Sequence, residues 1–283
     1  MDISSDIRSV ISRYGIKPKK KFGQNFVTDL TLLERMIGYA RVHPSDVVLE
    51  IGAGLGFLTE LLSEKAGKVI AVEKDSTLMR VLRNRLKSKK NIVLIEEDIM
   101  KMEALVFDKV VSNPPYQLSS PLLFKLLGCD FKVIVLTLQR EFAERLIAQE
   151  GTKEYGRLTV MARLRSRSEV LEYVNQAAFY PSPTIESAVV RLNPKGLSLK
   201  PRDENLLNLF VREVFTQRNK ISKKVVKEFV RKNLKLDGSS LNTLIEGFPY
   251  MGKRVYQISP YEFVELSNII WAVKRNLADD IVR

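Results

Sequence analysis

The tetrapeptide Asn113-Pro114-Pro115-Tyr116 combines residue types that can activate an amino group. Its two prolines predict a rigid, extended segment, which places the Asn113 side chain and the Pro114 carbonyl side by side as hydrogen-bond acceptors. Two acceptors on one exocyclic –NH2 group pull its nitrogen towards tetrahedral geometry and hold its lone pair in line with an electrophile. The segment therefore predicts amino methylation, with Tyr116 as a face on which a flipped base stacks.

A glycine turn and two spaced acids indicate the second substrate. The run Glu50-Ile51-Gly52-Ala53-Gly54-Leu55-Gly56 follows an apolar segment and opens a helical stripe. Glu73 ends the next apolar segment, where a carboxylate binds ribose hydroxyls, and Asp98 follows the third, where it can accept from an adenine amino group. Three acids, Glu50, Glu73 and Asp98, together with a glycine turn suit a cationic nucleoside without phosphates. S-adenosylmethionine is therefore a better ligand for this pattern than NAD.

These motifs lie at the ends of apolar runs that alternate with helix-spaced stripes, which predicts βαβ units and a parallel sheet. Two later runs, Glu169–Val174 and Ser187–Leu192, predict strands that close the sheet edge, one of them antiparallel. The alternation of Arg163, Arg165 and Arg167 is typical of an exposed edge that could face RNA. The five earlier predicted strands are Val47–Ile51, Val69–Glu73, Ile92–Glu96, Lys109–Ser112 and Val133–Leu138.

The net charge of +13 is distributed unevenly along the 283 residues. Residues 1–25 and 191–283 carry net charges of +4 and +8, whereas residues 26–190 carry only +1. Basic ends around a nearly neutral middle indicate a polyanionic partner, with nucleic acid as the leading candidate, and a merely solvated lysine-rich surface is an equal alternative on charge alone. The predicted organisation is a basic N-terminal arm (1–25), a cofactor-binding catalytic domain (26–195) and a helical RNA-binding domain (196–283).

The rare residue types exclude several classes of protein. A single cysteine, Cys129, and a single histidine, His43, rule out a thiolate zinc cluster and most histidine metal sites, so no metal is expected. Apolar runs such as Val133–Leu136 are far too short to span a membrane, and no apolar signal core opens the chain. A cytoplasmic protein without membrane contact is therefore expected.

Six segments together resemble the KsgA-type ribosomal RNA adenine dimethyltransferases in order and spacing, over nearly the whole chain. The related erythromycin-resistance methylases share the first two-thirds of the pattern, whereas the last segment and the basic C-terminal domain favour the small-subunit enzymes. Many bacterial members have Leu where this chain has Pro114. The six segments are Lys21–Phe26, Glu50–Gly56, Asn113–Tyr116, Tyr155–Leu158, Phe179–Pro183 and Phe215–Arg218.

The resemblance implies an α/β, Rossmann-like class I methyltransferase fold with a mixed seven-stranded sheet and a small C-terminal α-helical domain. It implies S-adenosyl-L-methionine as donor, S-adenosyl-L-homocysteine as product, and two adjacent adenines in the last hairpin of small-subunit rRNA as acceptors. The partner would be the immature small ribosomal subunit, and the enzyme a monomer. Tyr116 and Phe179 would sandwich the target adenine, beside Asn113 and Pro114. The cofactor-binding residues would be Gln24, Asn25, Val27, Glu50, Gly52, Gly54, Glu73, Asp98 and Asn113.

Two groups of basic residues are expected to hold RNA phosphates, although a disordered basic tail and a solvated helix face remain alternatives for them. Trp271 is expected to pack against the C-terminal helices rather than stack on a base. The Asn-Pro-Pro-Tyr motif alone does not separate adenine in RNA, adenine in DNA and a protein glutamine amide. A DNA adenine methylase and a non-catalytic assembly factor are therefore the alternative functions. The two basic groups are Lys17, Lys19, Lys20, Lys21 and Arg218, Lys220, Lys223, Lys224.

Overall fold

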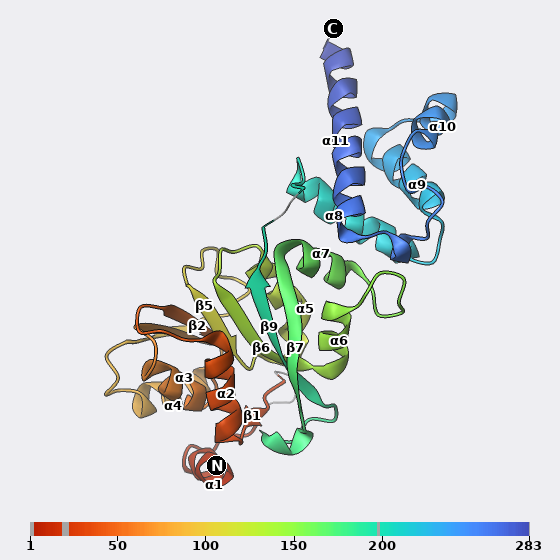
Figure 1. Ribbon diagram of the computed structural model, residues 1–283. Helices are drawn as coiled ribbons and strands as arrows, with labels where there is room; N and C mark the ends of the chain where they lie inside the picture. Colours follow the sequence, from red (N-terminus) through yellow and green to blue (C-terminus); the bar gives the residue numbers. More distant parts are fainter. Residues whose placement is uncertain (1–2, 19–22, 197–198, 283) are drawn as a thin grey trace. The chain divides into compact units, whose positions relative to one another are not determined.

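The computed structural model describes residues 3–18, 23–196 and 199–282 (Figure 1). Its centre is a seven-stranded sheet in the order β4-β3-β2-β5-β6-β9-β7. Six strands run in one direction, and β9 alone runs against its neighbours β6 and β7. The predicted mixed seven-stranded sheet is thus confirmed, with one reversed strand. The strands are β2 (Val47–Ile51), β3 (Lys68–Glu73), β4 (Ile92–Glu96), β5 (Lys109–Ser112), β6 (Val133–Gln139), β7 (Ser166–Val174) and β9 (Ser187–Pro194).

The central strands are buried on both faces, which explains why they are recognisable in the sequence. All four residues of β5 and the five inner residues of β6 are buried. Strands of this kind form continuous apolar runs rather than alternating ones. Helix α2 packs across β5, β6 and β9, and α4 packs against β3 and β4. The helices around the sheet are α1 (Ser4–Arg13), α2 (Leu30–Ala40), α3 (Phe57–Ser63), α4 (Ser76–Arg85), α5 (Ser119–Leu127) and α6 (Arg140–Ile147).

Side-chain caps determine where two of these helices begin. Asp29 accepts hydrogen bonds from the backbone N–H groups of Thr31 and Leu32 at the start of α2. Asp75 accepts from the Thr77 N–H at the start of α4, immediately after β3. Each cap satisfies backbone donors that the first helical turn leaves without partners. The turn after β3 is therefore held in place at the carboxyl end of this strand, next to Glu73.

A second, very small sheet lies outside the main one. Strand β1 (Phe26–Val27) pairs antiparallel with β8 (Phe179–Tyr180), with Val27 opposite Phe179. Short 3-10 turns flank two of the predicted site segments, η2 (Tyr116–Leu118) and η3 (Gln176–Ala178). The pairing joins the N-terminal segment to a loop more than a hundred residues later in the chain.

The chain divides into two compact units, 1–144 with 166–194, and 145–165 with 195–283. The segment 145–165, which was expected to belong to the catalytic domain, thus groups with the C-terminal helices. Tyr155 explains this grouping, because its side chain is fully buried and its hydroxyl donates to the Ile258 carbonyl at 2.7 Å. The second unit contains α7 (Arg157–Arg165), α8 (Glu204–Val214), η4 (Phe215–Gln217), α9 (Ser222–Leu234), α10 (Gly238–Glu246), η5 (Val255–Gln257) and α11 (Pro260–Val282).

The expectation of an exposed edge formed by Arg163, Arg165 and Arg167 is wrong for the first two. Arg163 and Arg165 lie on helix α7, and only Arg167 lies on strand β7. Their guanidinium groups form ion pairs within the second unit, Arg163 with Glu150 at 2.6 Å and Arg165 with Glu204. These two arginines are therefore engaged in intramolecular contacts.

Candidate active site

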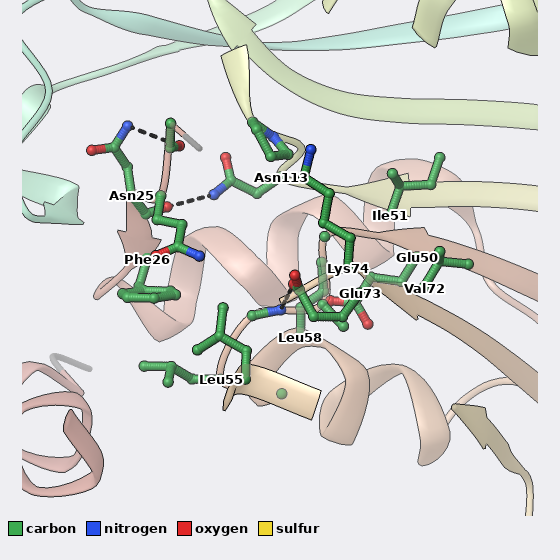
Figure 2. A pocket seen from close by; sticks show the side chains of 18 of the residues that line it. Asn25, Phe26, Glu50, Ile51, Leu55, Leu58, Val72, Glu73, Lys74 and Asn113 are labelled. Atoms are coloured by element: carbon green, nitrogen blue, oxygen red, sulfur yellow. Dashed lines mark hydrogen bonds between the residues drawn. The ribbon is translucent and has the colours of Figure 1, made fainter. Parts of the chain in front are cut away.

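The main cleft lies at the carboxyl ends of β2, β3 and β5, where open parallel sheets bind ligands (Figure 2). It encloses about 930 Å³, measured out to its open mouth. Among the described residues, its ionisable lining consists of four acids, Glu50, Glu73, Glu97 and Asp98, and one base, Lys74. An acidic cleft of this size favours a cationic small molecule. All nine residues predicted to bind the cofactor line it, namely Gln24, Asn25, Val27, Glu50, Gly52, Gly54, Glu73, Asp98 and Asn113.

The glycine turn lies at the switch point of the sheet, between β2 and β5, where the strand order reverses. Gly52 has a φ of 73°, and a Cβ built on it would lie 3.1 Å from Cδ of Pro115. Gly54 has a φ of 59°, and its Cβ would lie 3.3 Å from the Phe26 ring. Positive φ and close neighbours both require glycine here. The turn is thus held between the tetrapeptide after β5 and the N-terminal segment.

Glu73 is a buried carboxylate at the end of β3. Its Oε2 accepts from the Gly54 N–H at 3.0 Å and its Oε1 from the Asp75 N–H at 2.9 Å. Burial raises the pKa of Glu73, and these backbone donors partly oppose the rise. The carboxylate therefore has a fixed orientation at the cleft wall.

Asp98 lies two residues beyond β4 and is less buried, with a side chain 28% exposed. Its Oδ1 accepts from the Met100 N–H at 3.0 Å, and its Oδ2 lies 3.7 Å from Nζ of Lys74. The loop bond orients the carboxylate, and the long ion pair is the weaker contact. Asp98 thus keeps acceptor capacity towards the cleft.

Glu50 lies beneath the glycine turn and is only 2% exposed. Its Oε2 has no hydrogen-bond partner among residues 3–18, 23–196 and 199–282. Burial raises the pKa of Glu50 to about 8, and the nearby carboxylate of Glu73 contributes to the rise. A buried acceptor without a partner is costly in the protein alone. A cationic or hydrogen-bond-donating ligand would satisfy it.

Asn113 has an amide whose two ends have different roles (Figure 2). Its Nδ2 donates to the backbone carbonyl of Asn25 at 3.0 Å, which assigns the orientation of the amide. Its Oδ1 is buried and has no hydrogen-bond partner in the described part of the chain. The side chain lines the cleft immediately after β5, and its buried oxygen is an acceptor held in a fixed orientation.

The N-terminal segment 23–27 forms the part of the cleft wall that lies next to Asn113 and Pro115. A Cβ on Gly23 would lie 3.5 Å from Cβ of Pro115, so the segment crosses the tetrapeptide closely. The Gln24 amide donates to Oδ2 of Asp75 at 3.1 Å. Strand β1 then continues the segment into its pairing with β8. The cofactor-binding and base-binding segments predicted from sequence are thereby linked through backbone contacts.

The remaining predicted catalytic residues lie outside the residues that line the cleft. Pro114 is buried, and Pro115 lines the cleft in its place. Tyr116 is half-buried, and its hydroxyl lies 2.5 Å from Oγ of Ser187 on β9. Phe179 is 3% exposed and belongs to the hydrophobic core of the first unit. The predicted Tyr116–Phe179 sandwich for a base remains a prediction.

The predicted RNA-binding residues have varied surroundings. Lys17, Lys220, Lys223 and Lys224 are exposed, and Lys223 lies 3.6 Å from Glu246. Arg218 instead donates to the backbone carbonyls of Lys153 and Thr152 at 2.6 and 3.0 Å, which joins two loops of the second unit. Its role in phosphate binding stays a prediction alongside this structural one. The predicted residues Lys19, Lys20 and Lys21 lie outside the described residues.

Several site residues escape sequence reasoning. Phe26, whose ring covers Gly54, and Pro115, which packs on Gly52, lie within motifs that are recognisable through their other members. Lys74 follows Glu73 directly in the sequence. Its position next to a predicted cofactor-binding acid is the feature that could have indicated it as a site residue. Ser187 has no signal, because its contact with Tyr116 joins residues far apart in sequence.

The fold and this cleft define a Rossmann-like methyltransferase. The crystal structure of a dimethyladenosine transferase from Plasmodium falciparum is similar with a TM-score of 0.75 and 28% identity, covering 85% of this chain and 95% of that one. The 23S rRNA methyltransferase ErmE shares the fold, with a TM-score of 0.62, 24% identity and coverage of 87% and 99%.

Sequence comparison identifies the family within this class. Residues 15–249 match the family model described as ribosomal RNA adenine dimethylase. The probable ribosomal RNA small subunit methyltransferase A of Thermococcus kodakarensis is 40% identical over 264 residues, 93% of each chain. Its counterpart in Methanosarcina acetivorans is 38% identical over 95% of this chain and 99% of its own. The chain belongs to the ribosomal RNA adenine dimethylase family, which confirms the resemblance inferred from its motifs.

Two kinds of feature are absent from the described residues. No group of three or more His, Cys, Asp or Glu residues is placed to hold a metal ion within them. No helix in the described ranges has the length and apolar character that a membrane crossing requires.

Proposed function

We propose that this chain transfers methyl groups from S-adenosyl-L-methionine to N6 of two adjacent adenines in the 3′-terminal hairpin of small-subunit rRNA. The product is N6,N6-dimethyladenosine, and the reaction takes part in small-subunit biogenesis. The enzyme acts in the cytoplasm as a monomer on the immature small subunit. The observation that carries this proposal is the buried, partnerless Oδ1 of Asn113, oriented by the bond from its Nδ2 to Asn25.

The residues of the cleft fit S-adenosyl-L-methionine. Its acidic lining suits a ligand with a net positive charge and disfavours the pyrophosphate of a dinucleotide. Glu73 would hold the ribose, Asp98 the adenine, and the Gly52 turn with Asn25 and Val27 the methionine part. Glu50 lies below the turn with a partnerless oxygen that a cationic group would satisfy. When bound, the cofactor supplies a methyl group on a positively charged sulfur.

The chain's own residues would position and activate the amine. Asn113 Oδ1 accepts one hydrogen of the adenine N6 amino group, and the Pro114 carbonyl accepts the other. These hydrogen bonds localise the nitrogen lone pair and direct it at the methyl group, which supplies rate through positioning. The nitrogen becomes strongly acidic once it carries the methyl group, so it releases its proton to water without a strong base. Tyr116 supports the flipped base by stacking.

The test is a methyl-transfer assay with isotopically labelled S-adenosyl-L-methionine and three acceptors. These are undermethylated small subunits, naked small-subunit rRNA and duplex DNA. We expect N6,N6-dimethyladenosine in the first acceptor, mapped to adjacent adenines by primer extension. Label in duplex DNA would instead identify a DNA methylase. Binding to subunits without label in any acceptor would identify an assembly factor, and either result would refute the proposal.

A further inference from the structure

Strands β2 and β5 are neighbours in the sheet, and each leads directly into one half of the site. Their backbone pairing ends with Leu49 opposite Val110, two residues before the end of either strand. Beyond these ends lie Gly52 on one side and Asn113 on the other, both in the lining of the cleft (Figure 2). The spacing between the cofactor turn and the amine-binding segment is therefore set where the strand pairing has already stopped.

The Ser112 side chain takes over from the backbone pairing at this point. The Ile51 N–H donates to Ser112 Oγ at 3.2 Å, and the same hydroxyl donates to the Ile51 carbonyl at 2.5 Å. Ser112 is 0% exposed and Ile51 is 2% exposed, so both bonds form away from solvent. Removing the hydroxyl would take a partner from a buried backbone donor and from a buried acceptor. One hydroxyl thus joins the last residue of β2 to the last residue of β5.

The glycine turn is also held from its other neighbours. The N–H groups of Gly52 and Ala53 both donate to the Val72 carbonyl of β3, at 2.8 and 3.3 Å. Gly52 packs closely against Pro115, and this packing resists a closer approach of the two loops. The two bonds of Ser112 resist the opposite movement, a separation of the strand ends. Packing and hydrogen bonds together fix one spacing.

We propose that Ser112 is a positioning residue that fixes the distance between the methyl donor and the amine held at Asn113, and that this distance controls whether a second methyl group is transferred. The residue acts through the two strand ends rather than by contact with a substrate. The proposal rests on the proposed function, and it adds a determinant of the product, N6-methyladenosine or N6,N6-dimethyladenosine.

The second transfer depends more on this spacing than the first. Each transfer forms a nitrogen–carbon bond, breaks the bond between the methyl group and sulfur, and releases one proton from the nitrogen. In the first transfer two N–H groups meet two acceptors, Asn113 Oδ1 and the Pro114 carbonyl. In the second only one N–H group is left, so the amine is oriented by one hydrogen bond and by the fixed spacing of the loops. A misplacement of about 1 Å can lower such a rate about 100-fold.

The test is the variant Ser112→Ala, which removes the hydroxyl without adding volume. Single-turnover transfer to undermethylated small subunits, with the methylated nucleosides separated by chromatography, gives a rate constant for each of the two steps. We expect the ratio of the second rate constant to the first to fall at least about fivefold, so that N6-methyladenosine accumulates. Cofactor affinity, measured by calorimetry, should stay within about twofold of the wild type. Because the ratio does not depend on the fraction of folded enzyme, a loss of stability alone leaves it unchanged.

Two further variants separate the hydroxyl from the serine position and from the sheet. Ser112→Thr keeps the hydroxyl and should keep a ratio close to that of the wild type. Ser166→Ala makes the same change at a buried serine that begins β7, where the hydroxyl lies 3.0 Å from Oγ of Ser168, and should not alter the ratio.

An unchanged ratio in Ser112→Ala would overturn the inference, as would an equal fall in Ser166→Ala. A fall in Ser112→Thr as large as that in Ser112→Ala would also overturn it, because the effect would then come from packing rather than from the hydroxyl. Wild-type enzyme in the same assay separates these results from failure of the proposed function. If the wild type forms N6,N6-dimethyladenosine, they refute the role of Ser112 alone, whereas no methyl transfer by the wild type would refute both.

Discussion

At the scale of single residues, Asn113 joins the predicted chemistry to an observed geometry. One end of its amide is bonded to Asn25, and the other is an oriented acceptor that has no partner within the described residues. Leaving such an acceptor buried is unfavourable in the free protein, and residues with this cost are concentrated at functional sites. The substrate amine would supply the missing donor.

The first prediction concerns Asn113→Ala. Because this change removes an acceptor that acts on the reacting nitrogen, we expect single-turnover methyl transfer to fall at least about 100-fold. RNA affinity, measured by anisotropy, should stay close to that of the wild-type protein. Asn84→Ala, at an exposed position on α4, is the matched control and should keep full activity. Full activity in Asn113→Ala would remove the assigned role.

The second prediction concerns Glu50 and pH. Its pKa is about 8 in the folded protein against 4.5 in a model peptide, so between these values the unfolded carboxyl is ionised and the folded one is not. The unfolded state then binds fewer protons, and this residue's contribution to stability falls as pH rises from about 4.5 to 8. Glu50→Gln removes the effect, at about 1.4 kcal/mol per pKa unit and thus a few kcal/mol in total.

Denaturant unfolding of wild type and Glu50→Gln at pH 5 and pH 8.5 tests this expectation. The stability advantage of the variant should be larger at the higher pH. Glu97→Gln, at an exposed carboxyl on the same cleft, is the control for a Glu→Gln change as such. Equal advantages of Glu50→Gln at both pH values would show that this carboxyl is ionised in the folded state.

At the scale of elements, the site depends on the contact of two loops at the sheet switch point. The turn after β2 and the tetrapeptide after β5 pack closely, because a Cβ at position 52 would lie 3.1 Å from Pro115, and the φ of 73° there favours glycine. The N-terminal segment covers both and continues into β1, which pairs with β8. The described lining of the cleft comes from five chain segments, at residues 23–33, 50–58, 72–78, 97–99 and 113–118.

The third prediction tests this packing with two glycine substitutions. Gly52→Ala forces an L-residue to a φ of 73° and brings its Cβ to 3.1 Å from Pro115. We expect a loss of about 1–2 kcal/mol in unfolding free energy and weaker cofactor binding by calorimetry. Gly38→Ala lies inside α2 with open space around it, and it should stabilise the protein by about 0.5–1 kcal/mol. A neutral Gly52→Ala would show that the two loops can move apart.

At the scale of the whole molecule, charge is separated along the chain. The middle of the sequence is nearly neutral and carries the acidic cleft, whereas most of the basic excess lies in the C-terminal part. The cationic cofactor and the polyanionic RNA that we propose would therefore meet parts of the protein with charge of opposite sign.

The fourth prediction uses salt to test whether the second unit binds RNA phosphates. The triple change Lys220→Gln, Lys223→Gln and Lys224→Gln should reduce the slope of log affinity against log salt by about one for each phosphate that these lysines neutralise. The control removes three exposed lysines from the first unit, as Lys65→Gln, Lys68→Gln and Lys87→Gln, and should leave the slope unchanged. Equal slopes for both triples would place the RNA elsewhere.

Local sequence patterns predict the central strands well. Burial in the tertiary structure explains why helix α7 is not predicted from the sequence. Strands β2, β4 and β5 have the predicted bounds. Strands β2 and β5 are buried and form short apolar runs, whereas β4 is a partly exposed edge strand whose run Ile92–Ile95 is apolar all the same. Helix α7 escapes prediction because it is buried nearly all round, so its sequence lacks a one-sided stripe. The three alternating arginines near its end then resemble a strand.

The sequence by itself determined the types of residue at the carboxyl edge of the sheet, because glycine turns, prolines and strand-ending acids act over a few neighbouring positions. All nine predicted cofactor residues consequently line one cleft. Only the tertiary structure decided which end of the Asn113 amide is bonded to Asn25, that Ser187 contacts Tyr116, and that Phe179 pairs with Val27. These interactions join segments distant in the chain, and their register depends on how the whole core packs rather than on any local pattern.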